Sequence, residues 1–309
     1  KMKKKILIAT STFGVFSKKP INLLKENNYQ IVQNNKGRKL TKNELESSLK
    51  DCCGVIAGTE TYDAFILNKF DKLRVISRLG VGIDNIDTKV CKRKSIKIET
   101  TTTNPSLPVA ELTIGLILDL HRSITVNSQN IKSKLWIKNY GELFSGKKLG
   151  IIGLGNIGKE LVRLLKGFNL EILAYDKYPD HKFAKKNKVR ISSLDYLLKN
   201  SDIITIHLSL NKKTRNLISS VEFRKMKKNP YLVNTSRAEV INEKDLLSVI
   251  KKNKLKGFAF DVFHDEPYFG EILKYKNTIL TPHIGSYARE IRIKMEDESV
   301  KNLIKITND

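Results

Sequence analysis

The sequence feature that most constrains the fold is a glycine-rich stretch near the middle of the chain. A short apolar run at residues 149–152 is followed by glycines at 153, 155 and 158, and an amphipathic segment covers residues 159–167. This order is typical of a strand, a phosphate-binding turn and a helix. Gly153 is expected to permit the tight turn, Gly155 to let the backbone approach a pyrophosphate, and Gly158 to let the helix pack closely on the strand.

The residues beyond this turn indicate which ligand it binds. A helix N-terminus offers N–H groups and the positive end of its dipole to phosphates. A second apolar run, residues 170–175, ends at Asp176, about where a carboxylate can accept both ribose hydroxyls of a dinucleotide. Asp176 would repel the extra phosphate of NADP, so we expect NAD as the cofactor. The competing interpretation is a glycine turn in another kind of parallel sheet, with a solvated aspartate.

The apolar pattern on both sides of this stretch predicts an α/β protein with two domains. Short apolar runs alternate with helical spacing over residues 5–100 and again from 148 to 283, a pattern typical of parallel sheets covered by helices. We expect two doubly wound parallel-sheet domains. Residues 102–286 would form a Rossmann NAD-binding domain with about six strands, and residues 1–101 plus 287–309 a flavodoxin-like substrate domain.

A very apolar helix is predicted at residues 109–120, after Pro105 and Pro108, which are expected to break the chain. Such a helix must be buried, either between domains or between subunits. The arm that follows, up to residue 146, is polar except for two short apolar stretches, one of which contains Trp136. An exposed Trp often marks an interface, and the alternative is that Trp136 packs on its own domain.

Composition limits the partners and the compartment. The chain has 57 Lys and Arg against 32 Asp and Glu, a formal net charge of +25. These residues are scattered, without an arginine-rich arm or interleaved aromatic residues, so we expect small anionic substrates and no nucleic acid. No apolar run is long enough for a membrane span or a signal peptide. Three cysteines, at 52, 53 and 91, indicate neither a disulfide framework nor a metal site and fit a reducing cytoplasm.

Three residues that follow predicted strands are suited to hydride-transfer chemistry. Ligands of an open α/β sheet bind beyond the carboxyl ends of its strands, so Arg237, Glu266 and His283 should meet beside the cofactor. Histidine can take or give the hydroxyl proton, and a carboxylate on its other nitrogen fixes the tautomer. Arginine can grip a substrate carboxylate with two prongs and polarise the adjacent carbonyl. Asp261, at the same edge, could hold the carboxamide of nicotinamide.

The pattern leaves alternatives for each of these roles. His264 also lies near Glu266, but it falls in the middle of a loop, so His283 is preferred as the acid/base. Asp265 could replace Glu266 as the partner of the histidine. Arg237 could form a plain surface ion pair.

The remaining histidines have other expected positions. His207 ends a strand at the same edge of the sheet and is expected to line the cofactor site. His121 and His181 lie in helical or polar stretches and are expected at the surface.

Motifs along nearly the whole chain resemble those of the D-isomer-specific 2-hydroxyacid dehydrogenases. They occur in order at residues 78–87 (RLGVGIDNID), 109–113 (VAELT), 150–158 (GIIGLGNIG), 232–237 (LVNTSR), 261–263 (DVF), 266–267 (EP) and 281–285 (TPHIG). The resemblance implies hydride transfer between NAD and C2 of a D-2-hydroxyacid or 2-oxoacid. D-3-phosphoglycerate, hydroxypyruvate and glyoxylate are the candidate substrates. The family's catalytic Arg, Glu and His fall on Arg237, Glu266 and His283.

The same resemblance implies further binding residues. Added to the three glycines of the turn and His207, the expected cofactor contacts are Asn156, Ile157, Asp176, Thr235, Ser236, Asp261, Gly285 and Ser286. Val81, with Gly80 and Gly82, resembles the loop that meets substrate and nicotinamide, and Arg78 and Arg237 would bind the substrate. Family members are usually dimers built on the buried helix and the arm, so a homodimer is expected.

Two departures from the family pattern affect the substrate. Pro105 stands where many members carry Asn, so one polar substrate contact is missing or is supplied by Asn104. Phosphoglycerate enzymes usually place an arginine after the third strand, where this chain has GTET at residues 58–61, so a phosphate grip would rest on Arg78. We expect no appended regulatory domain of the kind that some phosphoglycerate enzymes carry.

Two other functions fit part of the pattern. An NAD-sensing corepressor-like protein of the same fold would bind the cofactor without turnover, and the basic charge would suit such a role, but the full set of Arg, Glu and His argues against it. A formate dehydrogenase of similar fold would have no hydroxyl proton to remove. The pairing of Glu266 with His283 would then be unnecessary.

Overall fold

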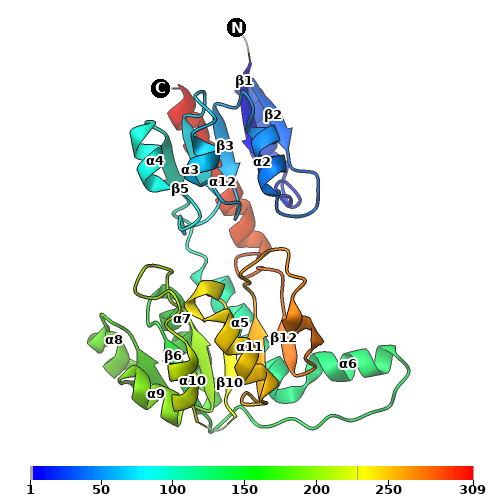
Figure 1. The fold of residues 1–309 in the computed structure, drawn as a ribbon, viewed down its shortest axis with the longest axis vertical. Helices are drawn as coiled ribbons and strands as arrows, with labels where there is room; N and C mark the ends of the chain where they lie inside the picture. Colours follow the sequence, from blue (N-terminus) through cyan, green and yellow to red (C-terminus); the bar gives the residue numbers. More distant parts are fainter. Residues whose placement is uncertain (1–2, 228, 309) are drawn as a thin grey trace. The chain divides into compact units, whose positions relative to one another are not determined.

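The computed structural model describes residues 3–227 and 229–308, and the chain divides into two compact units (Figure 1). Unit 1 comprises Lys1–Pro105 and Tyr287–Asp309, and unit 2 comprises Ser106–Ser286. Each unit is built on one parallel sheet with helices against it. The α/β class predicted from the apolar pattern is therefore confirmed.

Unit 1 has a five-stranded sheet in the order β2-β1-β3-β4-β5, which is the flavodoxin-like order. Its strands are β1 (Lys4–Ile8), β2 (Tyr29–Gln33), β3 (Gly54–Ala57), β4 (Val75–Arg78) and β5 (Lys97–Thr100). Its helices are α1 (Lys19–Glu26), α2 (Lys42–Leu49), α3 (Ala64–Leu67), α4 (Thr88–Arg93) and α12 (Arg289–Asn308). The central strands β3 and β4 are buried along their whole length, as expected when helices cover both faces of a parallel sheet.

The last helix, α12, brings the end of the chain back to unit 1. It packs against α1, β3, β4 and β5, and Met295, Val300 and Leu303 enter the apolar core there. Within the same helix Arg292 and Glu296 form a buried ion pair, with Nε and Oε1 3.3 Å apart, and Glu296 also accepts a hydrogen bond from the backbone N–H of Gly14 at 3.0 Å. Burial raises the pKa of the Glu296 carboxyl despite these partners.

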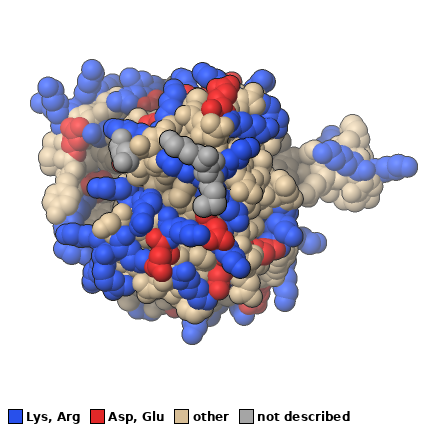
Figure 2. Space-filling model, turned by 90° about the horizontal axis from the view of Figure 1, so that it is seen from above, with Lys and Arg blue, Asp and Glu red and all other residues tan. Residues whose placement is uncertain are grey.

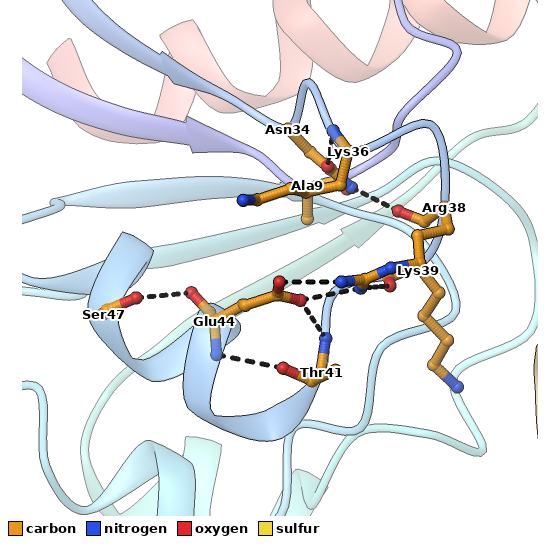
Figure 3. A network of polar contacts seen from close by, with 8 residues as sticks. All are labelled: Ala9, Asn34, Lys36, Arg38, Lys39, Thr41, Glu44 and Ser47. Carbon is orange, nitrogen blue, oxygen red and sulfur yellow. Dashed lines mark hydrogen bonds and ion pairs between the residues drawn. The ribbon is translucent and has the colours of Figure 1, made fainter.

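A network of polar contacts fixes the start of α2 (Figure 3). Thr41 and Glu44 form a capping box: the Thr41 hydroxyl accepts from the Glu44 N–H at 3.3 Å, and the Glu44 carboxylate accepts from the Thr41 N–H at 2.9 Å. The Arg38 guanidinium grips the same carboxylate through two hydrogen bonds of 2.8 Å. The Asn34 amide donates to the carbonyl oxygens of Ala9 and Arg38. The loop between β2 and α2 is thereby held to β1.

Unit 2 has a seven-stranded sheet in the order β12-β11-β10-β9-β6-β7-β8. The strands are β6 (Lys148–Ile152), β7 (Glu171–Tyr175), β8 (Val189–Ile191), β9 (Ile203–Ile206), β10 (Tyr231–Asn234), β11 (Gly257–Phe260) and β12 (Thr278–Leu280). The helices are α5 (Ser106–Arg122), α6 (Ile124–Lys132), α7 (Asn156–Leu164), α8 (His181–Lys186), α9 (Leu194–Asn200), α10 (Ser220–Lys225) and α11 (Glu243–Lys251). Three short 3₁₀ helices cover Leu165–Phe168, Ala238–Val240 and Glu271–Lys274. Reading from β8 to β11 gives the Rossmann order, with β12 added beyond it.

The sheet has seven strands, one more than the approximate number of six that was expected. The additional strand, β8, is three residues long and pairs only with β7 at the edge of the sheet. Its middle residue, Arg190, is exposed. A strand this short shows too few alternations to be recognised from periodicity.

The helix α5 begins at Ser106 and includes Pro108 in its first turn. Proline is compatible with that position because the first N–H groups of a helix have no intrahelical partner. The expectation that Pro108 breaks the chain was therefore wrong. The helix packs on α7, β10 and β11, and its residues Ala110, Leu116 and Ile117 belong to the core of unit 2.

His121, at the end of α5, is buried rather than exposed. Only 1% of it is accessible, and its ring packs against Phe144 and Tyr231 with centroid distances of 5.3 and 4.4 Å. The cause lies in the returning arm, where the N–H of Glu142 donates to the backbone oxygen of His121 at 2.7 Å. His181 is exposed, as expected.

The arm between α5 and β6 carries an apolar surface. None of the residues of α6 is buried, and beyond it Trp136 is 83%, Tyr140 95% and Leu143 73% exposed. Packing of Trp136 on its own domain is therefore excluded. Figure 2 shows Lys and Arg spread over the whole visible face rather than gathered in one patch. Within residues 3–227 and 229–308, no helix combines the length and the apolar composition that a bilayer span requires.

Candidate active site

The glycine turn joins β6 to α7 and has the geometry expected of a phosphate-binding turn. Gly153 has φ +101°, and a Cβ there would lie 2.6 Å from the backbone oxygen of His207. A Cβ at Gly158 would lie 2.3 Å from the oxygen of Gly153. A Cβ at Gly155 would meet nothing within 4 Å, and Gly155 gives α7 no side-chain cap. Gly153 and Gly158 thus allow close packing, whereas Gly155 keeps the surface of the turn open at the helix N-terminus, which fits a pyrophosphate.

Asp176 lies directly after β7, beside this turn. One carboxylate oxygen accepts from the N–H of Leu154 and the other from the N–H of Tyr178, both at 2.8 Å. These bonds hold the carboxylate at the rim of the glycine turn. This position fits the expected contact with the ribose hydroxyls.

His207 follows β9 and is surrounded by threonine hydroxyls. Its Nε2 lies 2.9 Å from Thr205 Oγ1 and its Nδ1 3.5 Å from Thr235 Oγ1, which in turn lies 3.0 Å from Thr113 Oγ1. Burial lowers the pKa of His207 to about 3, so the ring is neutral at physiological pH. His207 therefore links β9, β10 and α5 beneath the turn.

Arg237 stands on a tight loop at the end of β10. The side chain of Asn234 accepts from the N–H of Ser236 at 3.0 Å and from its hydroxyl at 2.8 Å, and it donates to the backbone oxygen of Arg237 at 2.9 Å. The Arg237 guanidinium donates to the Ser236 oxygen at 2.9 Å and is only partly buried. The loop thus fixes the backbone from which the arginine projects.

His283 and Glu266 form the expected pair. The Nδ1 atom of His283 lies 3.0 Å from each carboxylate oxygen of Glu266, and Glu266 also accepts from the N–H of Phe263 at 3.2 Å. Because a carboxylate only accepts, Nδ1 carries the proton, and Nε2 is left as the nitrogen for proton exchange. His283 has φ +56°, a left-handed conformation that is less favourable for a residue other than glycine. The partner of His283 is Glu266 rather than Asp265.

Asp261 has a role that the sequence analysis missed. Its side chain follows β11, is 1% exposed, and accepts from the Thr281 hydroxyl at 2.7 Å and from the N–H groups of Ile284 and Gly285 at 2.8 Å each. Burial raises the pKa of the Asp261 carboxyl. The carboxylate thereby holds the turn that carries His283. This role depends on the adjacency of β11 and β12 in the sheet, and the sequence alone contains no signal for that adjacency.

The loop after β4 belongs to unit 1 and is shaped by Arg78. This side chain is 8% exposed and donates to the backbone oxygens of Ala57, Leu79 and Gly82 at 3.4, 2.5 and 3.1 Å. A Cβ at Gly80 would lie 3.0 Å from the guanidinium, and Val81 is 55% exposed. Arg78 therefore supports the loop through its carbonyl groups.

Within unit 2 the predicted site residues lie on loops that follow the strands at the same edge of the sheet. The strands β10, β11 and β12 are neighbours, so the loops that carry Arg237, Glu266 and His283 start at adjacent carboxyl ends. The glycine turn and Asp176 follow β6 and β7 at the same edge. Among the described residues no group of His, Cys, Asp and Glu side chains is arranged to hold a metal ion.

The fold and these contacts define an α/β dinucleotide-binding protein with an acid–histidine pair at the cofactor edge. The family model for the NAD-binding domain of D-isomer specific 2-hydroxyacid dehydrogenases matches residues 114–285. A D-3-phosphoglycerate dehydrogenase of Methanocaldococcus jannaschii is 35% identical over an alignment of 288 residues, and the match covers 87% of this chain and 55% of that protein. A glyoxylate reductase of Thermofilum pendens is 33% identical over an alignment of 297 residues, and the match covers 93% of this chain and 87% of that protein. The chain belongs to the D-isomer specific 2-hydroxyacid dehydrogenase family, whose matched domain binds NAD.

Solved structures agree with this fold. A phosphoglycerate oxidoreductase from Vibrio cholerae superposes with a TM-score of 0.89 over 99% of both chains, at 23% identity. At that identity the likeness speaks for the fold alone. The chain spans 55% of the length of its M. jannaschii relative and 55% of that of a rat D-3-phosphoglycerate dehydrogenase.

Proposed function

We propose that this chain transfers a hydride between NAD and C2 of a D-2-hydroxyacid or 2-oxoacid. The observation that carries the proposal is the 3.0 Å contact between His283 Nδ1 and Glu266, at the sheet edge that also holds the glycine turn. An acid–histidine pair beside a dinucleotide site suits the removal of a hydroxyl proton. The names of the relatives, D-3-phosphoglycerate dehydrogenase and glyoxylate reductase, support the same reaction class.

The cofactor would be held by residues of unit 2. Gly155, Asn156 and Ile157 would meet the pyrophosphate, and Asp176 the ribose hydroxyls. Thr235, Ser236, Gly285 and Ser286 are the other proposed contacts, and His207 would support the turn from below. Bound NAD supplies the hydride acceptor or donor.

The protein's own groups would move the proton and hold the substrate. In the oxidation direction, His283 Nε2 takes the proton of the C2 hydroxyl while Glu266 keeps Nδ1 protonated and stabilises the imidazolium. Arg237 grips the substrate carboxylate with two N–H groups and, in reduction, polarises the carbonyl. Asp261 acts as a positioning residue because it holds the turn under His283.

Unit 1 would supply the substrate domain, through the loop of Gly80, Val81 and Gly82 that Arg78 supports. At the carboxyl end of β3 the chain places Glu60, which is 2% exposed. Its carboxylate accepts from the N–H of Gly58 at 3.0 Å, and residues 58–61 offer no guanidinium to a phosphate group. We therefore favour hydroxypyruvate and glyoxylate over 3-phosphohydroxypyruvate as the oxidised substrate.

Assembly and location complete the proposal. The exposed apolar arm supports a homodimer, and the three free thiols, Cys52, Cys53 and Cys91, support a cytoplasmic location. A corepressor-like protein without turnover is not favoured, because such a protein has no use for an acid–histidine pair.

The test is a survey of NADH oxidation with glyoxylate, hydroxypyruvate, 3-phosphohydroxypyruvate and pyruvate, together with variants of Arg237. R237A should lower kcat/KM by about 100-fold or more, because a charged two-pronged contact is lost. R237K should recover only part of it, since an ammonium cannot grip in two prongs. The exposed Arg224 on α10 gives the matched control, R224A, which should behave as wild type.

Two results would contradict the proposal. Binding of NADH without turnover across the panel would favour the corepressor-like function. Production of NADH from formate, without activity on any 2-oxoacid, would favour a formate dehydrogenase. A loss of NADH binding in R237A with normal turnover at high NADH would contradict the role of Arg237.

A further inference from the structure

A cavity lies at the edge of the unit 2 sheet opposite to the active site. It measures about 290 Å³, and the residues before strands β6, β9, β10 and β11 contribute to its lining. The charged and titratable residues that line it are Lys147, Lys227, Lys256, Glu142, Asp202 and His121. We call this cavity the amino-edge pocket. None of these residues takes part in the proposed reaction, which uses the carboxyl ends of the strands.

The rim of the amino-edge pocket is basic. Lys147 and Lys256 pair with Glu142, the former at 3.4 Å, and Lys227 pairs with Asp202 at 2.5 Å. Three ammonium groups thus face two carboxylates, and the lysine side chains remain between 32% and 48% exposed. An ammonium has three donors, so each lysine can serve a carboxylate and a further acceptor. The excess of positive charge favours an anion.

The wall of the pocket contributes a hydrogen-bond acceptor, in contrast to the lysine donors of the rim. His121 is 1% exposed, and its Nδ1 lies 2.8 Å from the backbone oxygen of Ile117. A carbonyl only accepts, so Nδ1 carries the proton and Nε2 is an acceptor. This Nε2 has no hydrogen-bond partner among the described residues. Burial lowers the pKa of His121, which keeps the ring neutral and leaves a buried acceptor unmet, and such atoms call for an explanation.

The two observations together select a ligand chemistry. Anionic oxygens would accept from the lysines, and an O–H group would donate to His121 Nε2. Neighbouring side chains cover this nitrogen, so binding would include a small movement of the side chains between it and the cavity. Inorganic phosphate at neutral pH has both features, as does a phosphate ester with a hydroxyl group, whereas sulfate has the charge and lacks the proton. We propose that the amino-edge pocket binds a phosphate anion that also carries an O–H group.

The position of the pocket gives such a ligand a structural effect. Glu142 belongs to the end of the arm, and its N–H donates to the His121 oxygen at 2.7 Å. Lys227 and Lys256 precede β10 and β11. A bound phosphate would therefore connect the root of the arm to the edge of the sheet and stabilise unit 2.

The experiment uses the full chain saturated with NADH, so that phosphate does not occupy the glycine turn. Calorimetric titration and thermal unfolding compare inorganic phosphate, glycerol 3-phosphate and sulfate at neutral pH and constant ionic strength. We expect phosphate to bind at least about tenfold more tightly than sulfate and to raise the unfolding temperature. The comparison of free phosphate with the ester shows which of the two is the ligand. Binding of either compound that is tighter than the binding of sulfate supports the site.

Variants separate the charge from the acceptor. The double variant K227Q/K256Q should lower phosphate affinity about tenfold or more, while K186Q, at an exposed lysine of α8, should change nothing. H121F keeps an aromatic ring against Tyr231 and removes the acceptor, so it should abolish the preference for phosphate over sulfate and retain weak binding of both. If H121F does not fold, the lysine variants and the comparison with sulfate still decide.

Three outcomes would overturn the proposal. They are equal binding of phosphate and sulfate by the wild type, binding that K227Q/K256Q leaves unchanged, and no binding of either phosphate compound. The first two would show a general ionic effect, and the third would show that the cavity holds only water. Each can occur with the proposed dehydrogenase activity intact, so the two proposals stand or fall separately.

Discussion

The glycines of the nucleotide turn differ at the level of single atoms, and this difference can be tested. In G155A the new Cβ enters space with no atom within 4 Å, and Gly155 has φ −75°, which alanine tolerates. The free energy of unfolding should therefore change by no more than about 0.5 kcal/mol. The methyl group should lower NADH affinity about tenfold or more, since it occupies the proposed place of the pyrophosphate.

The matched control is G158A, where the Cβ would lie 2.3 Å from the Gly153 oxygen. This variant should lose about 1–3 kcal/mol of stability because the helix must move away from the turn. Urea unfolding and fluorescence titration with NADH measure both effects. Wild-type NADH affinity in G155A would show that the pyrophosphate does not approach the turn at that glycine.

A second prediction concerns the support of His283. In D261N the amide nitrogen would face a backbone N–H or the Thr281 hydroxyl, all of which donate to Asp261 in the wild type. We expect a loss of about 1–3 kcal/mol in the free energy of unfolding and a fall in kcat that exceeds any change in the KM for NADH. The exposed Asp265 provides the control, D265N, which should do neither. A stable D261N with normal kcat would rule out the positioning role.

Single residues also show where sequence reasoning succeeds and where it stops. Arg237, Glu266 and His283 could be placed because each follows a predicted strand, and parallel strands end at a common edge. The positioning role of Asp261 depends on which strand lies beside β11, and the burial of His121 depends on the return of the arm over its side chain. Both are tertiary facts that local pattern does not contain.

At the level of elements, the start of α2 predicts a pH effect. The pKa of Glu44 is lowered from 4.5 to about 2, first by the hydrogen bonds from Arg38 and then by the N–H of Thr41. A carboxyl whose pKa is lower in the folded state contributes stability that is fully present above its unfolded pKa. This contribution should decline as the pH falls from 4.5 towards 2.

Urea unfolding at a series of pH values tests this effect. The variant E44Q should be less stable than wild type at neutral pH, and the difference should shrink as the pH falls below about 4.5. The effect will be modest and will weaken with salt, because the Arg38–Glu44 pair is exposed. Glu26, exposed at the end of α1, serves as the control, and E26Q should show no such convergence. A constant difference between E44Q and wild type at all pH values would contradict the prediction.

Elements were predictable where their signals are local. The apolar runs of the central strands appear as expected, because side-chain spacing determines them directly. The capping box of Thr41 and Glu44 is likewise set by a local spacing of two side chains. The edge strand β8 did not appear in the pattern because it forms by pairing with β7 rather than by its own alternation. The start of α5 differed from the predicted start because a proline in the first turn is compatible with a helix.

At the level of the whole chain, two series of alternating strands and helices were sufficient to predict two parallel sheets. Residues 287–309 were expected to belong to the first domain, and α12 packs on β3, β4 and β5. The apolar arm is different, since its expected position depended on a partner. Its residues remain exposed in the single chain, which is consistent with the proposed homodimer.

The arm therefore carries the prediction at this scale. Trp136 and Leu143 are 83% and 73% exposed, and tryptophan is among the residues that contribute most to the binding energy of interfaces. The double variant W136S/L143S should elute and scatter light as a monomer at concentrations where the wild type is a dimer. Its far-UV circular dichroism should match the wild type, because neither side chain contributes to the core of unit 2.

The control removes a large exposed apolar residue elsewhere, Phe65 of unit 1, which is 54% exposed. F65S should keep the wild-type mass, since the loss of apolar surface alone does not dissociate a dimer. If the arm forms the interface, the wild type should also unfold at a temperature that rises with protein concentration, and W136S/L143S should lose that dependence, because association adds to stability by mass action. A monomeric wild type, or a dimeric W136S/L143S, would place the function of the arm elsewhere.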